Sequence, residues 1–499
     1  MKLLIHFFVG LIVSLTALSG GAADPERDCL NLYRLTNISY AVEPGRLVPA
    51  TDTTPAHCRL QGVINRAIRV EVTMPVTDWN GRMMFSGVGG VGGFFGDTTS
   101  LLSRGFAMAT TDTGHEMEDL DFMRQPEALI DYAYRGVHLA TQFAKTAITR
   151  YYQRDIDYAY IKGCSNGGRA AMMEAVRFPD DYDGIIAGAP GLSYLEISAW
   201  MIGGARILKA NPLTRESLQL LDDTSRQACD GLDGVEDGVI DDPRRCTKDH
   251  FDIDTLVCAA DQRKGCLTRG QIETARNLYS DVVDETGNVL SPGVLPGAEA
   301  AGDWGMWVMP TGPRSKLVED LMRHDPDFDI DQWNPVTDRK KIAGVTLALD
   351  VRSADLTEFH ERGGKLLMYQ GWNDYPLRPG LVLDYLARAE RENGGAKETA
   401  EFFRLFMVPG MTHCAGGPGP WQADYVDPLV EWREKGKAPE RIVGTHPAGT
   451  IKPQPLSPVN SATQESSAYT RPLCPYPKYA KYTGRGDAKD ERNFVCMED

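Results

Sequence analysis

A serine stands at the centre of a glycine-rich pentapeptide that has the form of a nucleophile turn. The stretch from Gly163 to Gly167 reads GCSNG and fits the pattern G-x-S-x-G. A run of strand type, 158–161, precedes it, and a helix-forming run rich in alanine and methionine, 169–178, follows it. Small residues at both ends let the backbone turn sharply, which exposes the hydroxyl at a helix N-terminus. We therefore predict that Ser165 is a catalytic nucleophile; the alternative is a structural glycine turn that happens to carry a serine.

An acid and a base follow this serine in the order that such a nucleophile requires. In an elbow-type hydrolase an acid and then a histidine come later in the chain, each in a loop at a strand end. Asp374 follows the expected strand 364–370, and His413 follows the expected strand 404–409. We predict that His413 takes the proton of Ser165 as the hydroxyl attacks an ester carbonyl, and that Asp374 orients the imidazole.

Two other carboxylates compete for the role of the acid. Asp350 and Asp355 lie close to Asp374 in the sequence, but neither has the lead-in Gly-Trp-Asn from a strand. The chain has nine histidines, and a histidine is by default a polar surface or core residue. The strand-end position in the required order, and a cysteine directly beside it, distinguish His413.

Strands and helices alternate along two parts of the chain. This alternation predicts a mostly parallel sheet with helices on both faces, an α/β-hydrolase fold. Residues 195–342 are less periodic and richer in tryptophan, proline, acidic loops and cysteine, and we interpret them as an inserted lid domain. The catalytic domain would then comprise 24–194 and 343–499. The other expected elements are strands at 69–75, 82–87, 106–112 and 184–188, and helices at 131–150 and 427–437.

The N-terminus carries the pattern of an export signal. Lys2 is followed by an apolar run, 3–18, and by small residues that end at Ala23. This three-part pattern predicts a secretory signal peptide over 1–23. The alternative is a retained membrane anchor, for which the apolar run is short. We expect a secreted or periplasmic protein.

Export makes disulfides the expected state of the ten cysteines. They form no CxxC pair and have no zinc spacing with histidine. If Ser165 and His413 lie within hydrogen-bond reach, their neighbours Cys164 and Cys414 are close enough to be joined. Such a bridge would clamp the nucleophile to the base.

The composition restricts the class of partner. The 499 residues carry 53 basic and 69 acidic side chains, a formal net charge of −16, and no basic cluster interleaved with aromatics. Nucleic acid and anionic membrane surfaces are poor partners for such a protein. We expect a small-molecule ester as the partner and no organic cofactor.

An acidic loop in the expected lid has the composition of a calcium site. Asp230, Asp233 and Asp237 alternate with glycines and could bind a hard cation together with the carbonyl groups of Val235 and Val239. The spacing is not that of an EF-hand. The alternative is a solvated acidic loop.

Together these features resemble the tannase and feruloyl esterase family, whose hallmark is a disulfide between the cysteine before the serine and the cysteine after the histidine. The resemblance implies that the glycine-rich run GVGGVGG is an oxyanion loop, so that the N–H groups of Gly90 and Asn166 would bind the developing negative oxygen. It also implies structural calcium in the lid. The resemblance extends over nearly the whole mature chain. It rests on the segments 111–115, 134–138, 163–169, 364–374, 409–417 and 471–477.

The same family pattern, together with proximity in sequence, suggests the remaining disulfides. Each short bridge would stabilise the fold by roughly 2 to 4 kcal/mol, mainly by restricting the unfolded chain. The expected pairs are Cys29 with Cys58, Cys229 with Cys246, Cys258 with Cys266, and Cys474 with Cys496.

The resemblance implies a serine carboxylic-ester hydrolase that acts on esters of aromatic acids. Feruloyl (hydroxycinnamoyl) or galloyl esters, free or attached to plant polysaccharide or polyphenol, are the expected substrates. Because the family includes the hydrolase of mono(hydroxyethyl) terephthalate, a terephthalate monoester or another small aryl ester is the alternative. A non-catalytic extracellular binding protein on a hydrolase scaffold is a third possibility, against which the complete triad argues. Trp304 and Trp307 would either stack on the substrate's ring or belong to the lid core, and the sequence leaves this open.

Overall fold

The computed structural model describes most of the chain after the expected signal peptide. The described residues run from 24 to 498, without 263, 302–303, most of 305–345, and 452–463. The expected signal peptide, 1–23, and Trp307 therefore lie outside the described residues. Among the described residues, no helix has the length and apolar character that crossing a membrane requires.

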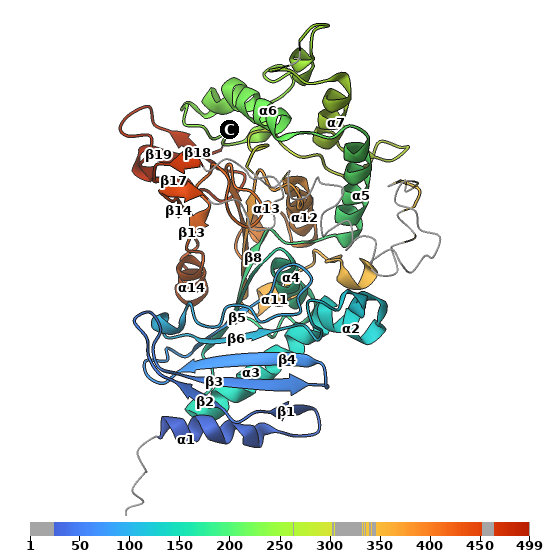
Figure 1. Cartoon of the computed structure of the whole chain (residues 1–499). Coiled ribbons are helices and arrows are strands. Elements are labelled where there is room, and N and C mark those ends of the chain that lie inside the picture. Colours follow the sequence, from blue (N-terminus) through green and yellow to red (C-terminus); the bar gives the residue numbers. More distant parts are fainter. Residues whose placement is uncertain are drawn as a thin grey trace, which may run out of the picture.

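A ten-stranded mixed sheet forms the centre of the molecule (Figure 1). Its order is β1-β3-β4-β6-β5-β7-β8-β11-β12, with β2 beside β3. The strands from β6 to β12 in this order are parallel, and β1 to β4 form an antiparallel extension at one edge. The strands are β1 (Tyr40–Val42), β2 (Arg46–Val48), β3 (His57–Ile64), β4 (Ile68–Pro75), β5 (Arg82–Ser86), β6 (Ala107–Thr111), β7 (Tyr158–Cys164), β8 (Gly184–Gly188), β11 (Lys365–Gly371) and β12 (Phe403–Val408).

Helices cover both faces of this sheet. Along β5, Met83 and Phe85 belong to one hydrophobic cluster, whereas Met84 belongs to another, because successive side chains in a strand point to opposite faces. The first cluster includes side chains of α3 (Gly136–Tyr152), α4 (Asn166–Arg177) and α12 (Pro379–Glu392), and the second includes those of α14 (Val426–Lys435). The predicted fold class, a mostly parallel sheet with helices on both faces, is confirmed. Shorter helices are α1 (Pro25–Leu30), α2 (Pro126–Ile130), α11 (Thr357–Glu361) and α13 (Ala396–Thr399).

A segment with several helices lies between β8 and β11, part of it outside the described residues. It contains α5 (Tyr194–Ala210), α6 (Arg215–Cys229), α7 (Arg269–Tyr279) and the hairpin of β9 (Val282–Val283) and β10 (Val289–Ser291), at the top of Figure 1. Threonine N-caps with full capping boxes start α6 and α7. Side chains of α5 pack in one hydrophobic cluster with residues that directly follow β11. The segment thus rests on the loop that carries the predicted acid.

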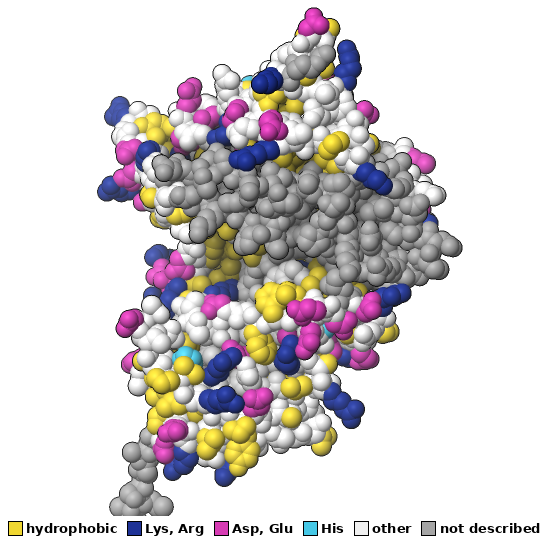
Figure 2. Space-filling view, in the orientation of Figure 1, with side chains coloured by type: hydrophobic (Ala, Val, Ile, Leu, Met, Phe, Trp, Pro, Cys, Tyr) yellow, Lys and Arg dark blue, Asp and Glu magenta, His cyan; other side chains and the backbone are white. Residues whose placement is uncertain are grey.

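Small antiparallel sheets complete the C-terminal part. One is built from β13 (Gln422–Ala423), β14 (Ile442–His446) and β17 (Tyr469–Leu473), and two others from β15 (Gly449–Ile451) with β16 (Gln464–Ser466) and from β18 (Tyr479–Tyr482) with β19 (Phe494–Met497). On the face drawn in Figure 2, acidic and basic side chains are interspersed.

Candidate active site

The turn between β7 and α4 has the geometry of a nucleophile elbow. Ser165 has φ 62° and ψ −122°, a region of backbone space that residues other than glycine rarely occupy. A Cβ at Gly163 would lie 2.4 Å from the carbonyl carbon of Gly167, and a Cβ at Gly167 would lie 2.6 Å from the oxygen of Gly87. Only glycine fits at either position, so the small residues of the motif allow the chain to pack tightly beneath the serine.

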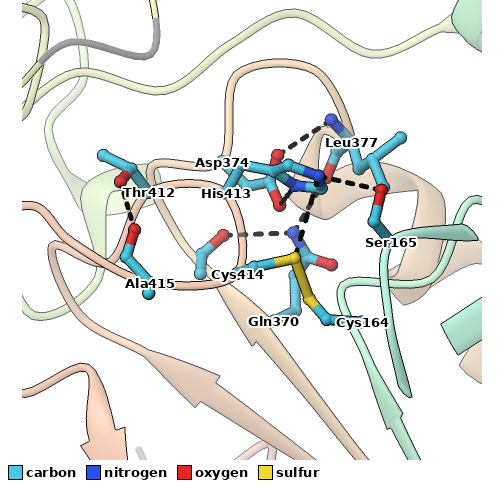
Figure 3. Close-up of a disulfide and its surroundings, with 10 residues drawn as sticks. Cys164, Ser165, Gln370, Asp374, Leu377, Thr412, His413, Cys414 and Ala415 are labelled. Carbon is cyan, nitrogen blue, oxygen red and sulfur yellow. Dashed lines mark hydrogen bonds and ion pairs between the residues drawn. A yellow bond between two sulfur atoms is a disulfide. The ribbon is translucent and has the colours of Figure 1, made fainter. Parts of the chain in front are cut away.

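Two hydrogen bonds join the serine, the histidine and the aspartate (Figure 3). His413 Nε2 lies 3.0 Å from Ser165 Oγ, and His413 Nδ1 lies 2.9 Å from Asp374 Oδ2. Both side chains of the His413–Asp374 pair are buried, with exposed fractions of 7% and 1%. The second carboxylate oxygen of Asp374 accepts the backbone N–H of Leu377 at 2.9 Å, which fixes the orientation of the carboxylate. The arrangement can transfer a proton from the hydroxyl to a histidine whose ring is held in place.

Neighbouring parallel strands bring the acid and the base together. Asp374 follows β11 and His413 follows β12. The two loops are hydrogen-bonded to each other, because the N–H of Trp372 donates to the carbonyl of Val408 at 3.0 Å and the N–H of Asn373 donates to that of Met411 at 3.1 Å.

The two competing carboxylates have other partners. Asp350 accepts the N–H of Tyr194 at 2.7 Å, at the start of α5, and Asp355 accepts the N–H of Thr357 at 3.0 Å, at the start of α11. The structure therefore places Asp374, and neither of these residues, beside His413.

A disulfide joins the residues next to the nucleophile and the base. Cys164 and Cys414 are bonded, with Cα atoms 6.0 Å apart, and Cys414 has a positive φ of 67°. The bond therefore connects the end of β7 to the loop after β12, and Figure 3 shows it beside Ser165 and His413. The other four bridges are Cys29–Cys58, Cys229–Cys246, Cys258–Cys266 and Cys474–Cys496.

Comparison with known proteins decides the family. A family model described as tannase and feruloyl esterase matches residues 55–497. The chain belongs to the tannase and feruloyl esterase family. It is 32% identical to an uncharacterized esterase of Xanthomonas campestris, with 100% of this chain and 95% of that protein covered, and 33% identical to the mono(2-hydroxyethyl) terephthalate hydrolase of Piscinibacter sakaiensis, with 90% and 86% covered.

A solved structure supports the same assignment. The crystal structure of feruloyl esterase B from Aspergillus oryzae matches with a TM-score of 0.83 and 26% identity, and the match covers 95% of this chain and 100% of that one. The protein is thus an ester hydrolase of the tannase and feruloyl esterase type, with the fold described above.

The glycine-rich loop of this family member presents free backbone donors. Gly90 has φ 60°, and a Cβ placed there would meet nothing within 4 Å, so this residue borders open space. Within the described part of the chain, neither the N–H of Gly90 nor that of Asn166 donates a hydrogen bond. Asn166 opens α4, where the first N–H groups have no intrahelical acceptor. Both groups are available to an oxygen that acquires negative charge.

The acidic loop concentrates carboxylates in a partly buried turn. Asp230 accepts the backbone N–H groups of Asp237 at 3.2 Å, Gly238 at 2.8 Å and Val239 at 3.2 Å, which curls the loop around it. The pKa of Asp233 is raised to about 7, first by burial and then by the neighbouring carboxylates of Asp237 and Asp230. Burial also raises the pKa of Asp237.

Arg471 forms an ion pair with Asp237 and so neutralises part of the negative charge of this loop. A further carboxylate, Asp241, is buried nearby, and burial and the proximity of Asp233 raise its pKa well above the ordinary value. Asp241 was not among the ligands predicted from the sequence. Hard oxygen donors are concentrated here and their ionisation is unfavourable without more positive charge, which is the donor chemistry that suits a calcium ion. However, no three carboxylates of this loop bring their oxygens within 4.8 Å of one another in the described structure.

A second group of possible ligands has another explanation. His138, Glu174 and Asp181 bring their ligand atoms within 4.8 Å of one another, the one such group of three found among the described residues. His138 Nδ1 already lies 2.6 Å from Asp181, and the ammonium of Lys145 donates to the Asp181 carbonyl. Burial, and then the nearby charge of Asp181, raises the pKa of Glu174 well above its ordinary value. The hydrogen bond accounts for the closeness of His138 and Asp181, and burial disfavours a charged Glu174 carboxylate as a metal ligand.

Trp304 lies in a packed aromatic cluster. Its side chain is 2% exposed, and its ring centroid lies 5.6 Å from that of Tyr279 and 4.9 Å from that of Tyr375. Of the two alternatives for this residue, the packing favours the lid core. Trp307 lies outside the described residues.

Proposed function

We propose that this protein is an exported serine carboxylic-ester hydrolase that cleaves esters of aromatic acids through an acyl-enzyme intermediate. One observation carries the proposal: the two hydrogen bonds that connect Ser165 Oγ, the imidazole of His413 and the carboxylate of Asp374. A serine hydroxyl is a weak nucleophile at neutral pH, and a hydrogen-bonded base is what activates it.

In the acylation step, Ser165 Oγ attacks the ester carbonyl carbon while its proton passes to His413 Nε2. The carbonyl oxygen becomes an oxyanion in the tetrahedral intermediate. When the intermediate collapses, the bond to the alkoxy oxygen breaks, and His413 returns the proton to that oxygen, so the alcohol leaves. Asp374 stabilises the imidazolium and keeps its carboxylate charge throughout.

Deacylation uses the same groups in reverse. A water molecule donates its proton to His413 Nε2 and attacks the acyl carbon. The second tetrahedral intermediate collapses with release of the aromatic acid, and the proton passes to Ser165 Oγ. Nucleophile and base are thereby regenerated.

The N–H groups of Gly90 and Asn166 are proposed to receive the oxyanion in both steps. Donors aimed at the position where charge develops are worth about 100- to 1000-fold in kcat each. The site supports this role because both N–H groups are free of other acceptors within the described chain and Gly90 faces open space.

Feruloyl, other hydroxycinnamoyl, or galloyl esters are the proposed substrates, free or attached to plant polysaccharide or polyphenol. The match to a solved feruloyl esterase B along 95% of this chain supports this choice. A terephthalate monoester is the second candidate, because a relative with 33% identity is named as a mono(2-hydroxyethyl) terephthalate hydrolase.

We assign supporting roles to the remaining parts of the chain. Residues 1–23 would direct export, 195–342 would form the lid, and 24–194 with 343–499 would form the catalytic domain. Asp230, Asp233 and Asp237, with the carbonyls of Val235 and Val239, would hold calcium, which supplies charge neutralisation in the lid and no chemistry at the serine. The five disulfides suit an oxidising compartment.

Side-by-side hydrolysis of methyl ferulate, methyl gallate and a terephthalate monoester tests the proposal, with Ser165→Ala as the control. A preference for one of the first two in kcat/KM, lost in Ser165→Ala, is expected. A preference for the terephthalate monoester would select the second candidate, and hydrolysis that survives in Ser165→Ala would refute the serine mechanism.

A further inference from the structure

A fully buried arginine lies one turn into the helix that follows the nucleophile. Arg169, in α4, is 0% exposed, and its hydrogen bonds go to neutral oxygens. Its Nε donates to the side-chain oxygen of Asn166 at 2.8 Å, and Nη2 donates to the backbone carbonyl of Tyr132 at 2.9 Å. Nη1 donates to the carbonyl of Ala133 at 2.7 Å and to that of Leu349 at 3.3 Å. The guanidinium also lies 5.2 Å from the centroid of the Tyr132 ring.

One branch of this network holds the start of the glycine-rich loop. The amide nitrogen of the Asn166 side chain donates to the backbone carbonyl of Val88 at 3.0 Å. Because Arg169 Nε occupies the side-chain oxygen of Asn166, the amide group is oriented with its NH2 toward the loop. Asn166 therefore has two roles. Its backbone N–H is one proposed oxyanion donor, and its side chain binds the loop that contains the other donor, Gly90.

A second branch holds the loop at Gly90. The hydroxyl of Tyr132, a side chain 1% exposed, donates to the carbonyl of Gly90 at 2.9 Å. One residue further on, Nε2 of His115 donates to the carbonyl of Val91 at 2.7 Å, and the His115 ring stacks on Phe122 with centroids 3.6 Å apart. The backbone carbonyls of Gly90 and Val91 are thereby fixed, in addition to that of Val88.

We propose that Arg169 is a positioning residue for the reaction, because it sets the spacing between the two oxyanion donors through Asn166 and Tyr132. This inference rests on the proposed serine mechanism. An oxyanion hole contributes only if its donors are already aimed at the developing charge, and a displacement of about 1 Å can cost about 100-fold in rate. A flexible loop of five glycines cannot maintain that aim by itself. The network supplies the missing restraint through Asn166 and Tyr132, and Tyr194 adds to it, because its hydroxyl lies 2.5 Å from that of Tyr132 and donates to the Asn166 side-chain oxygen at 3.5 Å.

A purely structural role is the competing explanation. A buried guanidinium carries a desolvation cost that apolar packing of α4 would avoid. The two explanations differ in what they predict for variants that keep the helix packed. A structural role changes thermal stability, whereas a positioning role changes kcat and the affinity for transition-state mimics.

The test uses two mild variants and one matched control. Tyr132→Phe removes the hydroxyl that donates to the Gly90 carbonyl. Asn166→Ala removes the side-chain hydrogen bond to the Val88 carbonyl but keeps the backbone N–H of residue 166. Tyr385→Phe is the control, because the Tyr385 hydroxyl is likewise bonded to a backbone carbonyl, that of Ser353 at 3.1 Å, in a fully buried side chain of α12.

We expect Tyr132→Phe and Asn166→Ala each to lower kcat about 10- to 100-fold, with KM changed less than about twofold. The affinity for an arylboronic acid, which forms a tetrahedral adduct with the serine, should weaken by the same factor, while that for the free aromatic acid should stay constant. Tyr385→Phe should retain kcat.

Arg169→Lys, which cannot make all four hydrogen bonds of the guanidinium, should reproduce the kcat loss of both variants. The inference is overturned if Tyr132→Phe and Asn166→Ala keep kcat, or if their losses match that of Tyr385→Phe and follow the melting temperature. Inactivity of Ser165→Ala, measured in parallel, separates these results from a failure of the proposed function itself.

Discussion

Cys164 and Cys414 are bonded to each other although 250 residues separate them, and each is the direct chain neighbour of a member of the Ser165–His413 pair. The covalent bond therefore runs alongside the hydrogen bond from the nucleophile to the base. Both Ser165 and Cys414 have positive φ angles, which are strained for residues other than glycine. The surrounding structure must therefore hold both residues in these conformations.

Removal of this disulfide should reduce activity while the fold persists. In a variant with both Cys164→Ala and Cys414→Ala, the distance between Ser165 Oγ and His413 Nε2 is no longer restrained by the bond, and we expect kcat to fall about tenfold or more. Loss of a bridge across such a long loop should also lower stability by roughly 5 kcal/mol in the chain-entropy model. Activity must therefore be measured well below the melting temperature, with circular dichroism recorded on the same samples.

The pair Cys258→Ala and Cys266→Ala provides the control, because that bridge closes a short loop in the segment between β8 and β11. It should lower the melting temperature and leave kcat unchanged. Equal kcat losses in the two double variants would show that the active-site bridge only stabilises the fold.

Substitution of the second glycine of the elbow should disturb both packing and activity. In Gly167→Ala, the new Cβ would lie 2.6 Å from the Gly87 oxygen, which belongs to the backbone and cannot move aside cheaply. We expect a loss of roughly 1 to 3 kcal/mol in the free energy of unfolding, with kcat strongly reduced because the glycine-rich loop is displaced.

Gly191→Ala is the matched comparison, since its nearest neighbour would lie 3.7 Å away in ordinary contact. Thermal melting and kcat of both variants check this prediction. If Gly167→Ala proves as active and as stable as Gly191→Ala, the close approach of the two loops is not required.

Calcium removal should lower stability more than activity. The carboxylates of Asp233 and Asp237 have raised pKa values in the metal-free loop, so a bound cation relieves unfavourable negative charge. At a free calcium concentration of about 100 Kd, binding contributes about 2.7 kcal/mol, which corresponds to roughly 3 °C in melting temperature for a protein of this size. Chelation should abolish this increment, while kcat at 25 °C changes little.

Asp233→Asn should make the melting temperature insensitive to calcium. Asp284→Asn, which changes an exposed turn between β9 and β10, should retain the full calcium response. If the melting temperature of Asp233→Asn still depends on calcium, the cation binds outside this loop.

The carboxyl of Asp350 should make stability depend on pH. Burial raises its pKa from 3.8 to about 6 in the folded protein. The folded state then retains this proton longer than the unfolded chain does, so the stabilisation is present below about pH 4 and is lost as the pH rises toward 6. Asp350→Asn keeps an oxygen that accepts the N–H of Tyr194 but cannot ionise, and its melting temperature should change less than that of the wild type between pH 4 and 6.

Asp355→Asn is the companion variant. The hydroxyl and N–H of Thr357 lower the pKa of Asp355, so its carboxylate is ionised throughout this range and its stabilising effect is lost only at lower pH. Its melting curve should therefore run parallel to that of the wild type. Parallel curves for Asp350→Asn as well would contradict the assignment.

Much of the site could be predicted because its residues sit at the ends of buried strands. β7 and β11 are interior parallel strands and β12 is the last strand of the sheet, and the largely buried apolar runs of all three mark the positions of Ser165, Asp374 and His413. The antiparallel strand β3, which lies between β1 and β4, was not predicted, because its buried residues alternate with exposed and half-buried ones.

The supporting contacts were beyond prediction for a different reason. Arg169 ends the stretch 163–169 that carries the nucleophile turn, but its partners include the backbone carbonyls of Tyr132, Ala133 and Leu349, which no residue type reveals. The burial of Trp304 against Tyr279 and Tyr375 likewise depends on how the helical segment rests on the loop after β11. Such contacts arise from tertiary packing rather than from local pattern.

The most direct measurement is the site of covalent labelling by an aryl fluorophosphonate, which reacts with activated serines, followed by intact mass and peptide mapping. The account predicts one adduct per protein, located on Ser165, with turnover lost in proportion to labelling and no adduct in Ser165→Ala. An adduct on another residue, or full turnover in the protein labelled at Ser165, would contradict it.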